Sequence, residues 1–311
     1  KKKLNRTQLS AFVANLPVCL IGIESCGGAH HWTRLFTEMG HTVRMMAPQF
    51  VKPYVKSNKN DSADAEAICE AVQRPTMRFI PAKSIEQQDI QSLHRIRSQL
   101  VARRTAQANQ IRGLLMEYGI VIPQGISYIR KSLPDILEDG ENRLSVLFRE
   151  QLSGLYEEMV HLDERIEVLE LSLKTISAQN EDCKRLLTIP GVGLMTATAL
   201  IAAVGDVNVF KSGRELAAWL GLVPRQHSTG GKPTLLGISK RGDSYLRTLL
   251  IHGGRAVVRS ANKHEDKRSQ WVAGVEQRRG KNITAVAVAN KNARIAWALL
   301  TKKENYQSCA A

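Results

Sequence analysis

The sequence predicts an α/β domain followed by an all-α region that contains a long helical arm. Three observations support this prediction. A strand–helix–strand pattern opens the chain, an apolar heptad repeat occupies its middle, and helical patterns separated by glycine-rich turns fill the remainder. We therefore expect three domains, over residues 1–83, 84–183 and 184–311.

The first domain begins with a βαβ pattern. The apolar run 17–23 is typical of a strand buried on both faces, and residues 42–46 predict a second strand. Apolar residues at helical spacing over 32–39 predict the connecting helix, so the strands should be parallel. A basic loop then leads to a helix that begins near Asp61, and a short third strand is expected over 76–80.

The middle of the chain is predicted to be a pair of long helices. One helix of about 30 residues is expected over 84–118. Beyond it, apolar residues recur from Leu155 to Ile176 in alternating steps of four and three, with acids on the outer positions. This pattern predicts a coiled-coil arm, antiparallel within the chain or between chains, and a helix of an ordinary bundle is the alternative.

The last domain is expected to be mostly helical, with helices over 184–204, 214–220, 240–260 and 281–300. Its tryptophans are more typical of a core than of platforms for stacked bases, so we expect them to be buried: Trp219, Trp271 and Trp297.

The charge is strongly basic and unevenly distributed. The 311 residues include 44 Lys and Arg against 29 Asp and Glu, a formal net charge of +15. Residues 1–137 carry +9, residues 138–183 carry −8 and residues 184–311 carry +14. The excess indicates either a polyanionic partner such as nucleic acid or a basic protein with an ordinary solvated surface. The acidic middle is better suited to protein contacts, so we expect the arm to form a homo-oligomer.

Cysteine usage and hydropathy indicate a cytoplasmic protein. The five cysteines, Cys309 among them, are scattered and form no CxxC pair, which fits reduced thiols. No apolar run approaches the ~20 residues that cross a bilayer, so no membrane partner is expected.

Three carboxylates are candidates for a metal site. Glu24 directly follows the first predicted strand, and Asp61 and Asp64 share one face at the start of a predicted helix. Hard oxygen ligands of this kind could hold Mg²⁺ or Mn²⁺ and position a phosphodiester. The alternative is that both aspartates only stabilise the helix start and that Glu24 is solvated.

A glycine-rich turn in the last domain is a candidate grip on a nucleic-acid backbone. The segment Leu187-Thr-Ile-Pro-Gly-Val-Gly193, followed by a helical pattern, is typical of a helix-hairpin-helix motif. Gly191 and Gly193 would let the turn approach a phosphate, and the free N–H groups of the next helix would bind it. A purely structural Pro-Gly turn is the alternative.

A serine with flanking cations follows this turn. The relevant segments are Ala217-Ala-Trp-Leu-Gly-Leu-Val-Pro-Arg225, Gln226-His227-Ser228-Thr-Gly-Gly-Lys232, Gly237-Ile-Ser-Lys-Arg-Gly242 and Leu246-Arg247. His227 is a candidate base beside Ser228, or a surface histidine. Ser239 is a rival nucleophile that we interpret as a helix N-cap. Five cations could neutralise a phosphate, or could simply be solvated: Arg225, Lys232, Lys240, Arg241 and Arg247.

Together with Glu24-Ser-Cys-Gly-Gly28 and Lys59-Asn-Asp-Ser-Ala-Asp-Ala65, these segments resemble the DEDD-type insertion-sequence transposases. That family contains the Piv-like DNA invertases and the bridge-RNA-guided recombinases. The resemblance implies a RuvC-like (RNase H-type) fold for the first domain. It also implies that Glu24, Asp61 and Asp64 match the second, third and fourth acids of a site for Mg²⁺ or Mn²⁺. The first acid has no counterpart here, from which we expect an amino-terminal truncation.

The same resemblance implies a site-specific recombinase in which Ser228 is the nucleophile. Attack on phosphorus would give a phosphoserine intermediate and a free 3′ hydroxyl. The expected partners are DNA, a structured noncoding RNA that supplies specificity by base pairing, and a second protomer that completes a composite site. The expected location is the bacterial cytoplasm, in association with the nucleoid. Two rival functions remain, a metal-dependent RuvC-like junction nuclease without a covalent step and a non-catalytic DNA-binding accessory protein.

Overall fold

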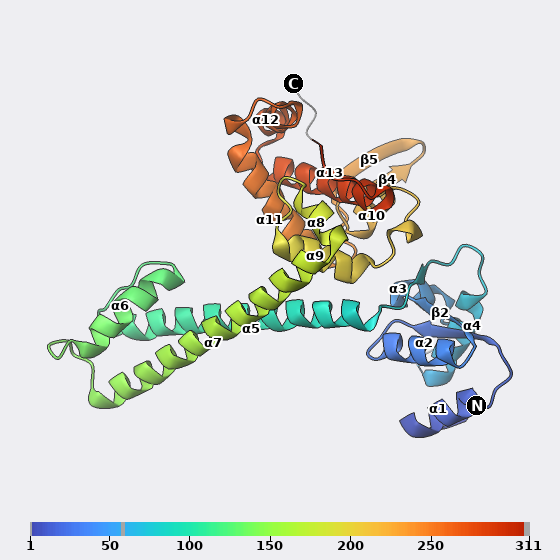
Figure 1. Ribbon diagram of the computed structural model, residues 1–311, viewed down its shortest axis with the longest axis horizontal. Helices are drawn as coiled ribbons and strands as arrows, with labels where there is room; N and C mark the ends of the chain where they lie inside the picture. Colours follow the sequence, from blue (N-terminus) through green and yellow to red (C-terminus); the bar gives the residue numbers. More distant parts are fainter. Residues whose placement is uncertain (1, 57–59, 308–311) are drawn as a thin grey trace. The chain divides into compact units, whose positions relative to one another are not determined.

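The computed structural model describes residues 2–56 and 60–307, and it is mostly helical with two small sheets (Figure 1). The chain divides into two compact units, Lys1–Ile85 and Glu86–Ala311. Residues 86–183 and 184–311 therefore belong to one unit, and their separation into an arm and a domain stays a prediction. Lys59 of the predicted motif, Lys1 and Cys309 lie outside the described residues. No helix in the described ranges is long and apolar enough to cross a membrane.

The first unit is built on the predicted βαβ pattern. Strand β1 (Leu20–Glu24) leads through α2 (Ala29–Glu38) to β2 (Thr42–Met46), and the two strands pair in parallel. The register runs from Leu20 opposite Thr42 to Glu24 opposite Met46. A third strand, β3 (Phe79–Ile80), pairs antiparallel with β2, which makes the order β1-β2-β3. The parallel pair and the short third strand confirm the sequence prediction.

The prediction that the first strand is buried on both faces is wrong. The strand begins at Leu20, not at residue 17, and Leu20 is 42% exposed while Val18 is 74% exposed. The reason is that β1 lies at an edge of the sheet, so part of it stays open to solvent although α4 (Asp61–Val72) packs on it. An added Cβ on Gly22 would lie 2.9 Å from Ile68, so the missing side chain allows this close packing.

Three short helices complete the described part of the first unit: α1 (Arg6–Ala14), α3 (Pro48–Val51) and the 3₁₀ helix η1 (Lys52–Tyr54). Asn5 caps α1 with a capping box that it forms with Gln8. Helix α4 begins at Asp61, as predicted, because the Asn60 side chain accepts a hydrogen bond from the Ala63 N–H at 2.9 Å.

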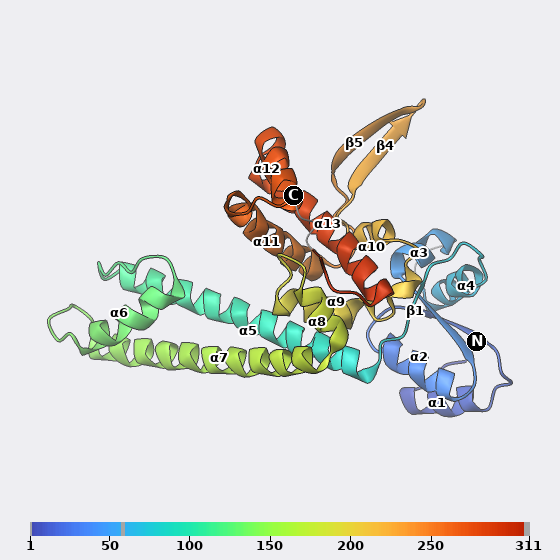
Figure 2. The same ribbon diagram turned by 45° about the horizontal axis from the view of Figure 1, so that its top comes forward.

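Two long helices run antiparallel in the second unit, α5 (Ile85–Met116) and α7 (Val146–Gln179) (Figures 1 and 2). Charged pairs tie them together in reverse order along the chain, Arg97 with Glu170 and Arg104 with Asp163, each at 2.6 Å. Helix α6 (Ile126–Glu138) packs across their far end. Every other residue of the heptad series is fully or almost fully buried, namely Met159, Ile166 and Leu173.

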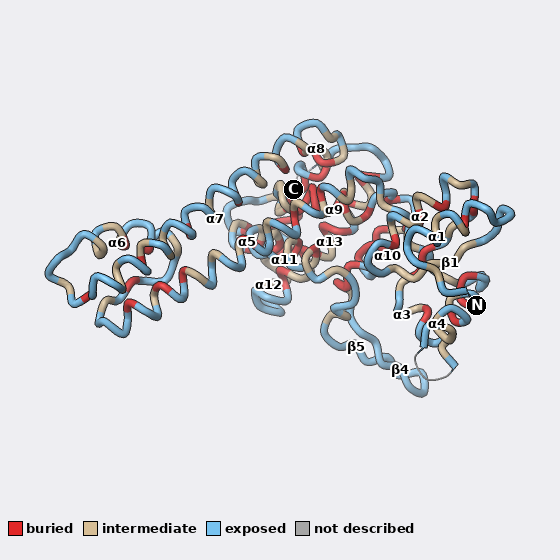
Figure 3. The backbone as a smooth tube through the Cα atoms, turned by 90° about the horizontal axis from the view of Figure 1, so that it is seen from below, coloured by how far each residue is buried: buried red, intermediate tan, exposed pale blue. Residues whose placement is uncertain are grey.

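The remainder of the second unit is a helical body with one hairpin. Its helices are α8 (Glu181–Leu187), α9 (Leu194–Val204), η2 (Val207–Val209), α10 (Gly213–Trp219), α11 (Ser244–Ser260), η3 (Ala261–Lys263), α12 (Lys267–Arg279) and α13 (Lys281–Lys302). Leucines and alanines of α9, α10, α11 and α13 form the main core. Figure 3 shows this buried centre in red and the hairpin of β4 (Pro224–Thr229) and β5 (Lys232–Ile238) in pale blue along most of its length.

Three expectations for this body are wrong. The segment 224–238 forms a hairpin that was not predicted, because its polar residues show no two-residue alternation. The helix expected over 240–260 begins at Ser244, and its N-cap is Asp243, not Ser239, because the backbone at Lys240 has a positive φ of 54° that is incompatible with a helix. Trp219 is 39% exposed, whereas Trp271 and Trp297 are partly buried against hydrophobic clusters.

Candidate functional site

The predicted nucleophile lies near the tip of an exposed hairpin. Strands β4 (Pro224–Thr229) and β5 (Lys232–Ile238) pair antiparallel, with Ser228 opposite Pro233 and Thr229 opposite Lys232. Gly230 and Gly231 form the two-residue turn with φ values of +56° and +75°. The tight two-residue turn that matches the twist of paired strands requires a positive φ at both of its residues. Glycine adopts this conformation easily, which explains the glycine pair. All β4 side chains are exposed, so Ser228 is open to a macromolecular substrate.

The hairpin itself supplies no base for Ser228. Its hydroxyl oxygen accepts a hydrogen bond of 2.7 Å from the side-chain amide of Gln226, two residues earlier on the same face. His227 points to the opposite face because successive strand residues alternate. The structure therefore does not place His227 to take the serine proton, and an amide donor cannot take it either.

The base of the hairpin is fixed by a close approach of two backbone segments. Ser239 N–H donates to the Val223 carbonyl at 2.8 Å, and Lys240 N–H donates to the Gly221 carbonyl at 3.1 Å. A Cβ on Gly221 would lie 2.0 Å from the Arg241 carbonyl oxygen, and one on Gly242 would lie 1.9 Å from that of Trp219. Side chains at these two glycines would separate the segments, so the glycines hold the hairpin on the helical body.

The five predicted phosphate-binding cations divide into two groups. Four are exposed and form no ion pair with any described residue, and two of these lie on the hairpin: Arg225, Lys232, Lys240 and Arg241. Arg247 is half-buried instead, and its guanidinium donates to the Leu220 carbonyl at 3.2 Å and to the Arg241 carbonyl at 3.5 Å. Arg247 thus braces the base of the hairpin in this structure.

The glycine turn of the predicted helix-hairpin-helix motif connects α8 to α9. Gly191 has a φ of +84° and contacts α11, where its added Cβ would lie 2.7 Å from the Gly253 carbonyl oxygen. The Pro190 carbonyl accepts hydrogen bonds from Arg268 at 3.1 Å and from Asn292 at 3.0 Å. This side of the turn is therefore engaged inside the body, and Gly191 has a packing role.

Gly193 has different surroundings. It is exposed, has no neighbour within 4 Å of an added Cβ, and precedes α9 without a side-chain cap. The first N–H groups of α9 follow it, which leaves this end of the turn as the part available for a phosphate.

The three candidate metal ligands lie in the first unit. Glu24 is the last residue of β1, not the residue after it, and Asp61 and Asp64 stand in the first turn of α4. Helix α4 packs on β1, so the three carboxylates come from two contacting elements. Asp61 is exposed, and Glu24 and Asp64 are half-buried.

The donor chemistry of these carboxylates fits a hard divalent ion, but the side chains are not gathered into a site. Across residues 2–56 and 60–307, no three His, Cys, Asp or Glu side chains lie close enough together to hold a metal. Glu24, Asp61 and Asp64 thus fit a divalent ion only by their ligand type and by their position on two contacting elements.

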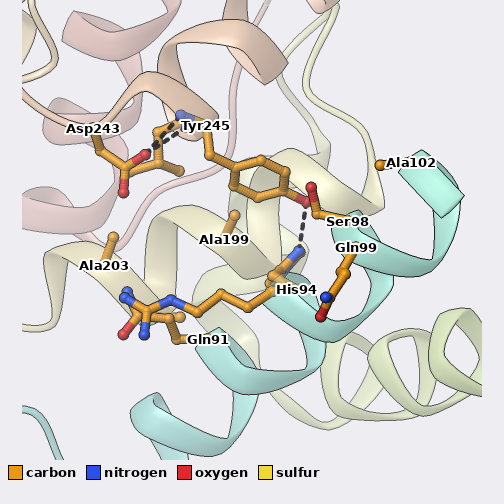
Figure 4. A pocket seen from close by; sticks show the side chains of 12 residues that line it. Gln91, His94, Ser98, Gln99, Ala102, Ala199, Ala203, Asp243 and Tyr245 are labelled. Atoms are coloured by element: carbon orange, nitrogen blue, oxygen red, sulfur yellow. Dashed lines mark hydrogen bonds between the residues drawn. The ribbon is translucent and has the colours of Figure 1, made fainter.

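Sequence reasoning missed a buried histidine in a pocket of about 440 Å³ between α5, α9 and α11 (Figure 4). His94 is 3% exposed, and its ring nitrogens lie 3.0 Å from the Tyr245 hydroxyl and 2.9 Å from that of Thr198. Burial, assisted by the Arg97 charge, lowers the pKa of His94 to about 4. Its position in the apolar stripe of α5, four residues after the buried Ile90, was the available signal.

Comparison with known proteins gives matches over most of the chain. Residues 3–120 match the DEDD transposase domain of the IS110 family, and residues 183–270 match the transposase IS116/IS110/IS902 family. The DEDD match implies a RuvC-like fold for the first unit and suggests dependence on a divalent metal.

Individual relatives agree with these matches. The chain is 50% identical over 308 residues to a "Probable family 20 transposase" of Pseudomonas aeruginosa, covering 99% of this chain and 91% of the relative. It is 49% identical over 310 residues to the "Transposase for insertion sequence element IS1111A" of Coxiella burnetii, covering 100% and 85%. A "Pilin gene-inverting protein" of Moraxella bovis is 30% identical over 131 residues, covering 41% and 39%. The chain therefore belongs to the IS110/IS116 family of DEDD transposases.

Proposed function

We propose that this transposase cuts and rejoins DNA at specific sites through a covalent bond to Ser228. The observation that supports this most strongly is the exposed hairpin. It presents Ser228 beside a turn of two glycines without side chains, which leaves room for a DNA strand. Arg225 and Lys232 lie on the same hairpin and form no ion pair with any described residue. A rigid base and an accessible tip are what a nucleophile needs to enter a DNA duplex.

The chemical step conserves the phosphodiester bond energy. The Ser228 hydroxyl releases its proton to water as its oxygen attacks phosphorus, the bond from phosphorus to the 3′ oxygen breaks, and the 3′ oxygen takes up a proton from water and leaves as a hydroxyl. The phosphate remains esterified to serine and to the 5′ side. A 3′ hydroxyl from the other strand end then attacks the same phosphorus and expels the serine oxygen. Arg225, Lys232, Lys240 and Arg241 would stabilise the developing negative charge.

We place the activation of Ser228 outside the hairpin, because neither Gln226 nor His227 is positioned to take its proton. We assign this role to the carboxylates Glu24, Asp61 and Asp64 of a second protomer. A divalent ion such as Mg²⁺ or Mn²⁺, when bound there, would lower the pKa of an attacking hydroxyl and neutralise phosphate charge. The side chains of this chain provide oxygen ligands on β1 and α4, which support one another by packing.

Three further elements belong to the proposal. The antiparallel helices α5 and α7 of the second unit correspond to the predicted coiled-coil arm. They would join protomers through the acidic outer face of α7. The turn that contains Gly191 and Gly193 would grip a DNA backbone as a helix-hairpin-helix, with the N–H groups after Gly193 as donors. A structured noncoding (bridge) RNA, accommodated by the +15 charge, would select the target by base pairing in the nucleoid.

The test is a denaturing gel of the full chain mixed with end-labelled DNA that spans an element end, with Mg²⁺ and the flanking RNA present. Wild type is expected to give a protein-linked DNA band. Ser228→Ala should lose this band and all joined product while it still shifts DNA in a native gel. Ser239→Ala is the matched control, a serine at the hairpin base, and should keep the band.

Two results decide against the proposal. Cleavage and joining by Ser228→Ala would indicate a metal-only nuclease. Binding without any cleavage or protein-linked band, for wild type and with either Mg²⁺ or Mn²⁺, would indicate a DNA-binding accessory protein.

A further inference from the structure

The exposed face of α11 consists almost entirely of residue types that commonly contact phosphate. Six positions of this helix are exposed, and five of them are spaced by four, four, three and four residues, which places them on one face: Ser244, Thr248, His252, Arg255 and Arg259. The sixth is Ala256. The exposed Lys263 in η3 extends the same line.

The orientation of this face is set by the opposite side of the helix. Leu246, Leu250, Gly254 and Val258 recur every four residues and are buried against the helical body. Gly254 allows contact with α13, where its added Cβ would lie 2.3 Å from the Ala285 carbonyl oxygen. The phosphate-binding types are therefore held outward by the packing and contribute little to it.

No acid among the described residues pairs with the cations of this face. Arg255, Arg259 and Lys263 form no ion pair within the described ranges. The acid at the start of α11, Asp243, is used as the N-cap and accepts hydrogen bonds from two backbone N–H groups. Arg259 lies in the last turn and suits the helix dipole, but Arg255 lies beyond the reach of that effect.

We propose that this face is a binding surface for a nucleic-acid backbone, separate from the catalytic hairpin and continuous with its base. Helix α11 starts three residues after Arg241, and Ser244 to Arg259 spans about 22 Å at 1.5 Å per residue. Two guanidiniums, an imidazole and the Ser244 hydroxyl along that length are donors for successive phosphate oxygens, whereas the Thr248 hydroxyl already donates to the Ser244 carbonyl at 2.8 Å. The proposal rests on the proposed function only in taking nucleic acid as the substrate.

An acidic protein surface, such as the arm of a second copy with its net charge of −8 over residues 138–183, is the other class of partner that cations could meet. The composition of the face favours nucleic acid. Protein interfaces have a buried centre of apolar and aromatic residues, whereas Ala256 is the one apolar residue exposed on α11. Cations and small polar side chains on one helix face are typical of contacts to phosphate.

The test compares two double variants that each remove two positive charges from an exposed helix. Arg255→Gln/Arg259→Gln alters the proposed surface, and Arg278→Gln/Arg279→Gln alters the end of α12 as the matched control. Both are made in the full chain with Ser228→Ala, so that binding is measured without cleavage. The affinity for a mixed-sequence DNA duplex and for an RNA stem-loop is measured against salt concentration.

The proposal predicts that the α11 variant lowers the slope of log affinity against log salt by about 2, at roughly 0.9 per lost phosphate contact on duplex DNA. The control should change the slope by less than about 0.5 on that scale. Arg255→Lys/Arg259→Lys should restore the slope because it keeps the charge. A loss confined to one probe identifies that nucleic acid as the occupant.

Three results overturn the proposal. The slopes for DNA and RNA are both unchanged, or the control lowers them equally, or the α11 variant alters the sedimentation coefficient and leaves both slopes intact. The last result would assign the face to a second copy. A failure of the Ser228 chemistry would not change these slopes, so the two proposals are tested separately.

Discussion

The hydroxyl of Tyr245 donates a hydrogen bond to Nδ1 of His94 over 3.0 Å. The direction follows from Thr198, whose hydroxyl donates to the Leu194 carbonyl at 2.8 Å and therefore accepts from Nε2 of His94 at 2.9 Å. His94 is thus neutral, with its proton on Nε2. The two hydrogen bonds of His94 join α5 to Thr198 of α9 and to Tyr245 in the first turn of α11 (Figure 4). Helix α11 follows the base of the hairpin along the chain.

The neutral state of His94 makes stability depend on pH in a defined direction. Burial first, and the Arg97 charge second, lower its pKa to about 4 from an ordinary 6.5. The unfolded chain therefore binds more protons between these values, and the free energy of unfolding falls as pH decreases from 6.5 to 4. We expect a loss of about 2 kcal/mol, reduced from the full shift because water reaches the adjoining pocket. Urea unfolding at several pH values measures it, and His94→Gln should flatten this part of the profile; an unchanged profile would contradict the account.

Removal of the Tyr245 hydroxyl should destabilise the fold. Tyr245→Phe leaves Nδ1 of the buried His94 without its donor, and we expect a loss of about 1–3 kcal/mol in the free energy of unfolding. Tyr128→Phe removes a hydroxyl from a tyrosine that is 49% exposed and should cost less than about 0.5 kcal/mol. Equal effects of the two variants in chemical denaturation would show that the hydrogen bond is not important.

The contact between Gly191 and Gly253 predicts that an alanine at Gly253 destabilises the fold, whereas an alanine at another helical glycine, Gly274, does not. A Cβ on Gly253 would lie 1.8 Å from the Gly191 carbonyl oxygen, whereas one on Gly274 in α12 has no neighbour within 4 Å. Gly253→Ala should cost at least about 2 kcal/mol because α11 must move away from the α8–α9 turn. Gly274→Ala should gain roughly 0.5–1 kcal/mol from helix propensity. Thermal unfolding of both variants checks this; a tolerated Gly253→Ala would mean that the turn and α11 are not in tight contact.

The carboxylate proposal predicts a loss of chemistry without a loss of fold. Asp64→Asn should abolish the protein-linked DNA band and leave thermal stability within about 0.5 kcal/mol, since Asp64 forms no ion pair with any described residue. Glu66→Gln on the same helix is the matched control and should keep the band, because this exposed residue pairs, among the described residues, only with Lys56 at 3.7 Å. Chelation of divalent ions with EDTA should have the same effect as Asp64→Asn. An active Asp64→Asn protein would exclude this aspartate as a ligand.

Elements with strong periodicity could be predicted from the sequence. The βαβ unit, the start of α4 at Asp61 and the long helix α5 all follow from apolar spacing and a single N-cap residue. The heptad series of α7 also predicted which residues face a partner helix, because 3.5-residue periodicity fixes one seam whatever the partner is. Its partner is α5 of the same chain, as the Arg104–Asp163 pair shows.

The hairpin at the candidate site could not be predicted in this way. Strand β4 is exposed on both faces, so no apolar alternation marks it, and only the Gly230–Gly231 pair indicates its turn. The preference for Ser239 as a cap failed because Asp243 lies in the position from which a side chain reaches the Tyr245 and Leu246 N–H groups. Gly191 and Gly253, 62 residues apart in the sequence, illustrate the general reason: a close backbone approach depends on tertiary packing, which no local pattern encodes.

The central claim is that Ser228 becomes bonded to phosphorus. The most direct measurement is mass spectrometry of the protein-linked DNA after nuclease and protease digestion, with the modified residue located by fragmentation. The account predicts a residual nucleotide phosphate on Ser228, at the tip of the hairpin. A phosphate on Ser239, on Thr229 or on any tyrosine would contradict it.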